Sequence, residues 1–136
     1  MPVFYPRVGQ QWLAGIVRTA LAASELALYQ SSITPNENTT LAELEAAEAD
    51  YTGYARAAIT NFGAVFQTPL GAGIQSPLTQ FQPTDPTTVP NDIGGAFLVD
   101  ATGDLVTVIT FPEVKGMASS LDAIPISEIL RFGSGL

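Results

Sequence analysis

The chain has 136 residues, which predicts one domain spanning 1–136, and it is 46% hydrophobic, only 13% charged and of formal net charge −8. Five basic residues stand against 13 acidic ones, so the composition argues against nucleic-acid binding, which needs clustered Lys and Arg. The absence of Cys and His excludes disulfides, thiolate metal sites and histidine-based catalysis.

Residues 1–8 are expected to form an extended N-terminal arm. Pro2 and Pro6 oppose a helix there. Val3, Phe4 and Tyr5 make the arm apolar, so we expect it to be covered. It would either fold back onto the core of its own chain or lie on a neighbouring subunit.

Residues 9–22 are predicted to form a helix. Trp12, Ile16 and Ala20 recur at a spacing of four, and a parallel row of apolar residues lies beside them. Trp12 would anchor the helix to a sheet or, as the alternative, contact a partner protein.

Residues 25–32 are predicted to form a strand, with Leu26 and Leu28 on one face and Ala27 and Tyr29 on the other. Pro35 and its Asn neighbours place a loop over 33–38. Thr40, followed three residues later by Glu43, predicts a capped, short acidic helix over 41–48.

Extended structure is expected over 54–59 and again over 62–66, after a bulge at Gly63. Residues 67–95 contain five Pro and four Gly, and they are predicted to form a long loop. Such loops are usually functional or bound to a partner. Leu78 and Phe81 suggest that this loop packs against something rather than remaining free.

The last third of the chain carries the strongest strand pattern. Residues 97–100 and 105–111 predict a hairpin whose turn uses Gly103, with Pro112 ending the second strand. Both faces of 105–111 are apolar, so this strand would be central or covered by a partner. Residues 124–132 predict a last strand, in which Pro125 indicates an edge or a bulge. The predicted fold is mainly β, a small sandwich or barrel with an N-terminal helix and a short acidic helix.

Two groups of acidic residues are candidate sites. The acids between Glu37 and Asp50 could hold calcium, but they lack the EF-hand pattern, and a solvated helix face explains them more simply. Asp100 and Asp104 could act as an acid/base pair on a sugar, but the simpler interpretation is a hairpin tip. We therefore expect no enzyme, no catalytic residue, no metal and no cofactor.

Tyr51, Tyr54 and Arg56 surround a predicted turn at Gly53. They could present two phenol rings and a guanidinium group to a partner, because Tyr and Arg are enriched at protein interfaces. Alternatively, Tyr54 fills the core and Arg56 neutralises an internal carboxylate.

The chain resembles a group of small virion proteins of tailed bacteriophages. The matching phrases are Leu26-Ala-Leu-Tyr29, Ile33-Thr-Pro35, the acidic helix and Tyr51-Thr-Gly-Tyr-Ala55, followed by Gly95-Ala-Phe-Leu-Val-Asp100. That group often carries a Trp in its middle segment, where this chain has Phe62 and Phe66. The resemblance implies a mainly β fold attached to a virion.

The sequence thus predicts a capsid cement or decoration protein, made in the host cytoplasm and located on the capsid surface. It would bind the major capsid protein and associate with itself as a homotrimer, without binding nucleic acid or membrane. The low charge fits a surface that partners cover. The alternative is a tail or baseplate adaptor or a host-adsorption module. The candidate contact residues are Val3, Phe4, Tyr5, Tyr51, Tyr54, Arg56, Leu78 and Phe81.

Overall fold

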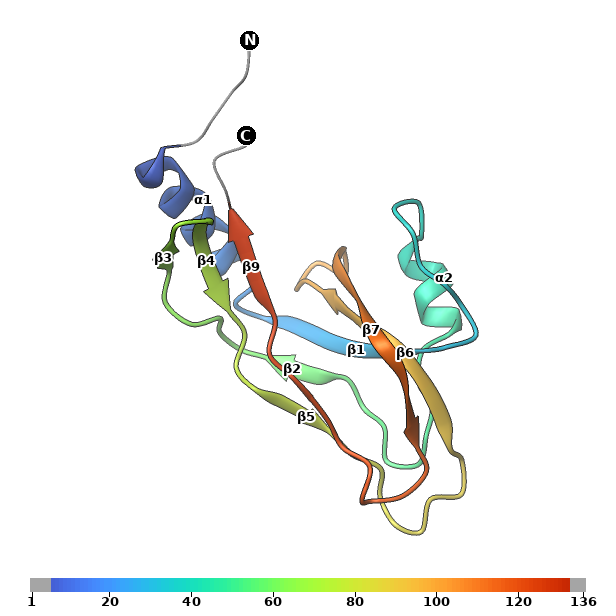
Figure 1. The fold of residues 1–136 in the computed structure, drawn as a ribbon. Helices are drawn as coiled ribbons and strands as arrows, with labels where there is room; N and C mark the ends of the chain where they lie inside the picture. Colours follow the sequence, from blue (N-terminus) through green and yellow to red (C-terminus); the bar gives the residue numbers. More distant parts are fainter. Residues whose placement is uncertain (1–5, 133–136) are drawn as a thin grey trace.

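A computed structural model describes residues 6–132 (Figure 1). Its elements are α1 (Arg7–Ala20), β1 (Ser24–Gln30), α2 (Leu41–Ala46), β2 (Ala57–Ile59), β3 (Phe66–Thr68), β4 (Gly71–Gln75), β5 (Thr79–Phe81), β6 (Asn91–Val99), β7 (Leu105–Met117), β8 (Ile124–Ile126) and β9 (Ile129–Phe132). The chain is mostly β with an N-terminal helix and a short acidic helix, which confirms the predicted fold class. Neither described helix combines the length and apolar character needed to cross a bilayer.

The strands form two layers of antiparallel pairs. The main sheet has the order β2-β1-β6-β7, and the second layer contains β3-β4-β9 and the pair β5-β8. The pairing of β4 with β9 is interrupted at Ser76 and Glu128 and then continues as the pairing of β5 with β8. One buried cluster joins side chains of both layers, including Leu28 and Leu98 from the main sheet and Ile74 and Ile126 from the other.

Strand β1 lies inside the main sheet and is buried on both faces. Leu26 and Leu28 face the core between the layers, whereas Ala27 and Tyr29 face a second cluster that includes Leu44 of α2. The predicted alternation along this strand is therefore confirmed. Covering both faces explains why a short strand contributes four consecutive buried apolar residues.

Helix α1 begins two residues earlier than predicted, so Arg7 and Val8 belong to it and not to the arm. Pro6 precedes it with φ −63°, a value that suits a helix start. Its buried face includes Ala14, Val17 and Leu21, and it packs on β4 and β9. Trp12 is 65% exposed, which corrects the prediction of a core anchor, because its row faces away from the sheet. Residues 1–5, with Val3, Phe4 and Tyr5, lie outside the described residues.

Residues 67–95 do not form one long loop. They contain β4 and β5 and parts of β3 and β6, while their prolines fall in the connections between these strands. Glycine supports β4, because a Cβ on Gly73 would lie 2.7 Å from the Phe66 ring. The irregular connection 82–90 is held by Thr52, whose hydroxyl accepts the amide hydrogens of Thr88 and Val89 at 2.9 and 3.0 Å. Of the residues 62–66 that were expected to form a strand, only Phe66 does so, as the first residue of β3.

Strand β7 runs through Pro112, which was expected to end it. The β6–β7 register moves from Gly95–Thr110 to Ile93–Lys115, so residues 111–114 oppose Gly94 alone. Pro112 lies in this bulge, where no ladder hydrogen bond is required of it. Within the described chain β7 is an edge strand, not a central one. Its cover by a partner remains a prediction.

The hairpin between β6 and β7 has the predicted turn, and Gly103 adopts φ +88° there. The predicted strand over 124–132 is divided into β8 and β9 by residues 127 and 128. Pro125 pairs with Gln80 in the two-stranded β5-β8 sheet. Its expected edge position is thus observed.

Candidate functional site

Tyr51, Tyr54 and Phe81 form an aromatic cluster beneath the surface. The Tyr51 and Tyr54 rings meet edge to face at 5.3 Å, and the Tyr54 and Phe81 rings stack at 6.4 Å. Tyr51 and Phe81 are buried, so the expected surface pair of phenol rings is not formed. Burial raises the pKa of Tyr51 to about 12. The Tyr51 and Phe81 rings fill the core of this chain, so neither lies on a surface open to a partner.

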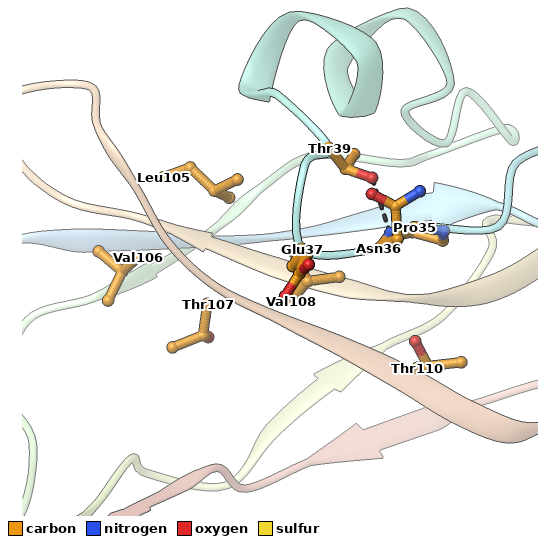
Figure 2. Close-up of a pocket in the computed structure, with 9 residues that line it drawn as sticks. All are labelled: Pro35, Asn36, Glu37, Thr39, Leu105, Val106, Thr107, Val108 and Thr110. Atoms are coloured by element: carbon orange, nitrogen blue, oxygen red, sulfur yellow. Dashed lines mark hydrogen bonds between the residues drawn. The ribbon is translucent and has the colours of Figure 1, made fainter.

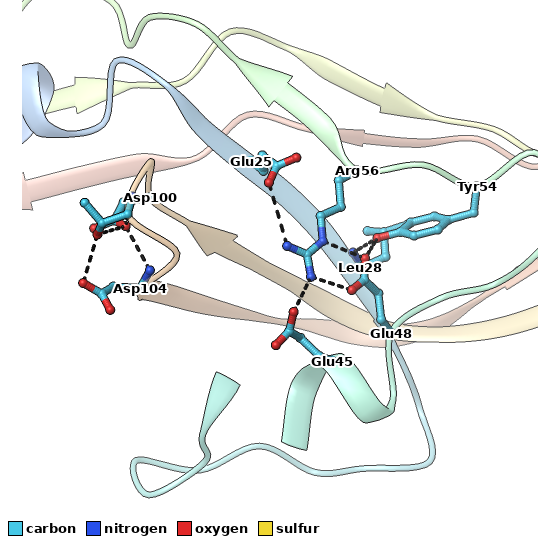
Figure 3. A network of polar contacts seen from close by, with 9 residues as sticks. Glu25, Leu28, Glu45, Glu48, Tyr54, Arg56, Asp100 and Asp104 are labelled. Atoms are coloured by element: carbon cyan, nitrogen blue, oxygen red, sulfur yellow. Dashed lines mark hydrogen bonds and ion pairs between the residues drawn. The ribbon is translucent and has the colours of Figure 1, made fainter. Parts of the chain in front are cut away.

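Arg56 forms an ion pair with Glu48. Its Nε and Nη2 donate to the two oxygens of Glu48 at 2.9 and 2.7 Å, and Nη2 also reaches Glu45 at 3.0 Å (Figure 3). The guanidinium carbon lies 5.6 Å from the Phe97 ring centre, on the face of the main sheet that α2 covers. Arg56 therefore joins β2 to the α2 segment across β1.

Glu48 is shared between Arg56 and Tyr54. The Tyr54 hydroxyl donates to Glu48 Oε2 at 2.7 Å and accepts the Leu28 amide hydrogen at 3.2 Å (Figure 3). Burial raises the pKa of Glu48, but the hydrogen bonds from Arg56 and Tyr54 outweigh it and hold the pKa below its usual value. Burial and the bond to Glu48 raise the pKa of Tyr54. This arrangement matches the alternative prediction, in which Tyr54 and Arg56 serve the fold.

The acids between Glu37 and Asp50 do not converge on one cation site, and the two that meet, Glu45 and Glu48, pair with Arg56. Thr40 caps α2, since its hydroxyl accepts the Glu43 amide hydrogen and donates to the Glu43 carboxylate. Asp50 accepts a hydrogen of the Asn91 side-chain amide at 2.8 Å. Within residues 6–132 no group of three or more His, Cys, Asp or Glu side chains is placed to hold a metal ion. The calcium hypothesis thus has no support from these residues.

Asp100 and Asp104 belong to the β6–β7 turn. Asp100 accepts the amide hydrogens of Thr102 and Asp104, each at 2.9 Å, and the Thr102 hydroxyl bridges the two carboxylates (Figure 3). The hydrogen bond from the Thr102 side chain, with those from nearby amides, lowers the pKa of Asp100. Asp104 is exposed and Asp100 half-buried at the turn, in agreement with the simpler interpretation of this pair.

A surface hollow of about 380 Å³ lies between the 35–39 loop and residues 105–110 of β7 (Figure 2). Glu37 is the one charged residue that lines it, and no Arg, Lys or Tyr does so. The loop uses its own polar groups: the Asn36 amide donates to Thr39 Oγ1, and the Asn36 side chain accepts the Asn38 amide hydrogen, both at 2.8 Å. The lining offers no paired acid and base, and we assign it no chemistry.

Glu128 lies at the break between β8 and β9, and the sequence pattern did not single it out. The Thr107 hydroxyl of the main sheet donates to its Oε1 at 2.6 Å, while its Oε2 is buried with no hydrogen-bond partner among the described atoms. Burial raises the pKa of Glu128, and the bond from Thr107 offsets only part of this. The carboxyl group links the two layers.

We expect Glu128→Gln to change how stability depends on pH. A raised folded-state pKa means that Glu128 contributes its stability fully below the ordinary pKa of 4.5 and loses it as pH rises through the folded value. The variant cannot ionise, so its free energy of unfolding relative to the wild type should rise between pH 4 and pH 7.5. Urea denaturation of both proteins at the two pH values measures this. An equal difference in unfolding free energy between variant and wild type at the two pH values would contradict this prediction.

No protein-family model, no curated protein and no solved structure matches the chain. The resemblance to phage virion proteins therefore remains a prediction from short sequence phrases.

Proposed function

We propose that this chain is a capsid cement protein of a tailed bacteriophage. It would bind the outer surface of the major capsid protein shell and stabilise that shell. The proposal is supported by the sequence resemblance together with one observation on the structure: apolar side chains lie in solvent on the turns of the 67–95 segment.

These exposed side chains come from the connections between strands. Leu70 lies in the β3–β4 turn, Leu78 lies just before β5, and Val89 lies in the 82–90 connection. Leu121, in the connection between β7 and β8, is 92% exposed. That connection is tied to the 82–90 segment, because Asp85 accepts the Ser120 amide hydrogen at 3.0 Å. Val89 and Leu121 thus lie on connections that are joined to each other, and exposed apolar side chains on joined connections favour a partner surface.

A cement role needs only binding energy. A ligand that binds the assembled shell and not its separated subunits stabilises the shell by mass action, by about 2.7 kcal/mol per site at a hundredfold excess over Kd. Many copies on one lattice, held also by self-association, would add avidity. The predicted homotrimer belongs to this proposal and would form on the shell, at its local threefold positions.

The test is binding of the purified protein to shells of its cognate major capsid protein. We expect saturable binding that raises the temperature at which the shells disrupt. Leu78→Ser should weaken this binding about tenfold, because it removes an apolar contact with the shell. The variant should still fold, because Leu78 is exposed and contributes little to the core. Val114→Ser, at an exposed position of β7, is the matched control and should bind like the wild type.

Two results would count against the proposal. Shells that neither bind the protein nor gain thermal resistance would reject the cement role. Recovery of the protein with tails instead would favour the tail adaptor or adsorption module.

A further inference from the structure

Helix α1 presents an apolar row to solvent. Val8, Trp12 and Ile16 recur every four residues and are 79%, 65% and 47% exposed. The opposite side of the helix packs on β4 and β9. A helix on the surface of a monomer normally turns polar residues outward, so this row is a surface without a visible partner in the described chain.

A hollow of about 560 Å³ lies beside this row. It is lined by Gln11, Trp12, Gly15, Ile16, Thr19 and Ala20. No charged residue lines it, and the absence of charge is typical of the centre of a protein interface. A large projecting ring and a hollow over small residues thus lie next to each other on one helix face.

Gly15 is not required by the fold of its own chain. A Cβ added there would meet no atom within 4 Å, and its φ is not in the positive range. Glycine inside a helix costs about 1 kcal/mol relative to alanine. A missing side chain at this position is useful where another backbone or ring approaches closely.

Charge indicates which partner can approach this helix. Residues 1–24 contain two Arg and no acid, so the remaining residues carry three basic and all 13 acidic side chains. Two copies of a chain of net charge −8 repel one another over most of their surfaces. That repulsion is weakest where the α1 segments face each other, which favours a second copy at this face.

We propose that α1 pairs antiparallel with α1 of a second copy about a twofold axis, with the Trp12 indole of each filling the hollow over Gly15 of the other. Centred between Trp12 and Gly15, this register also places Val8 against Thr19. Such a contact is self-complementary, as a twofold interface must be. A parallel pair in register would instead set Trp12 on Trp12 and Gly15 on Gly15, which leaves a void.

The contact is small, and this sets the affinity to expect. A 14-residue helix is about 21 Å long, so the pair buries less than the ~800 Å² per partner of a standard interface. We expect a dissociation constant of roughly 10–1,000 µM for the free chain. The contact is independent of the proposed cement function, because it is measured without shells.

Sedimentation equilibrium of the full chain, at loading concentrations up to about 1 mM, tests the pairing. The wild type should show a reversible monomer–dimer equilibrium. Because Trp12 is the only tryptophan, its fluorescence should shift to shorter wavelength as the dimer forms and the ring leaves water. A chain that stays monomeric throughout, or that forms a trimer, would overturn the twofold pairing.

Three variants distinguish this pairing from non-specific hydrophobic association. Trp12→Ser should weaken association at least ~10-fold. Gly15→Leu should weaken it as strongly while keeping the helix, although it adds apolar surface and would strengthen non-specific association. Leu121→Ser removes an apolar side chain that is more exposed than Trp12 and lies outside α1, so it should leave the dimer affinity unchanged. Tighter association of Gly15→Leu, or weaker association of Leu121→Ser, would contradict the proposed contact.

Discussion

Gly95→Ala should reduce the free energy of unfolding by about 3–5 kcal/mol, enough to leave a domain of this size largely unfolded. Gly95 lies in β6 between Tyr29 of β1 and Thr110 of β7. A Cβ there would lie 2.0 Å from the Ile109 carbonyl oxygen and 2.4 Å from the Tyr29 hydroxyl oxygen. Neither distance is possible between real atoms, so a strand or the ring must move.

The surroundings leave little room for that movement. Tyr29 is fully buried, and its hydroxyl donates to Thr110 Oγ1 at 3.2 Å. Ile109 belongs to the ladder between β6 and β7, immediately beside the bulge that already interrupts it. Overpacking at such a point strains a central strand pair and not only one side chain. Urea denaturation followed by tyrosine fluorescence and circular dichroism measures the loss.

Gly15→Ala is the matched control for this prediction. The same methyl group added in α1 meets nothing within 4 Å, so it should stabilise the protein by up to ~1 kcal/mol. Opposite signs for the two substitutions are the expected result. Equal stabilities of Gly95→Ala and the wild type would mean that β6 and β7 are not paired in the register described.

The sequence predicted features that depend on near neighbours. The alternation of Leu26, Ala27, Leu28 and Tyr29 identified β1, and the Thr40–Glu43 pair identified the start of α2. The turn at Gly103 followed from its flanking strands. In each case the residues that decide the structure lie within a few positions of one another.

The predictions were wrong where contacts between distant parts of the chain determine the structure. Helix α1 has apolar residues on both sides, and only β4 and β9 determine that Ala14 is buried and Trp12 exposed. The Pro and Gly residues of 67–95 suggested one loop, but the short strands between them find partners in β9 and β8, more than forty residues later. Pro112 is tolerated inside β7 because of a bulge that depends on register with β6.

The candidate site was predicted only in part, for the same reason. Tyr54 and Arg56 were identified from their chemistry, but their partner depends on how the turn at Gly53 brings the chain back beside Glu48. Phe81 and Thr52 are brought into the same region by tertiary contacts. Glu128 had no local pattern at all, since its burial results from the packing of two layers.

Arg56→Met should reduce the free energy of unfolding by about 2–3 kcal/mol. The substitution keeps the apolar stem but removes the charge that pairs with Glu48, and it leaves that mostly buried carboxylate with the Tyr54 hydroxyl alone. Breaking a fully buried pair costs about 3–5 kcal/mol, and partial exposure of Arg56 lowers this. Arg7→Met, at an exposed position, is the matched control and should change stability by less than ~0.5 kcal/mol.

A double-mutant cycle assigns the loss to the pair. Arg56→Met leaves the Glu48 charge unpaired, and Glu48→Gln removes that charge. The double variant should therefore be at least ~1 kcal/mol more stable than the sum of the two single losses implies. Additive losses would mean that Arg56 acts through its packing on Phe97 and not through Glu48.

The pH dependence provides an independent readout of the same pair. The lowered pKa of Glu48 means that its contribution is present above the ordinary pKa of 4.5 and is lost as pH falls through the folded value. The stability gap between wild type and Arg56→Met should therefore narrow as the solution is acidified below pH 4.5, because protonated Glu48 no longer needs a cation. A gap that stays constant into acid would show that the ion pair does not set the stability at this junction of β1, β2 and α2.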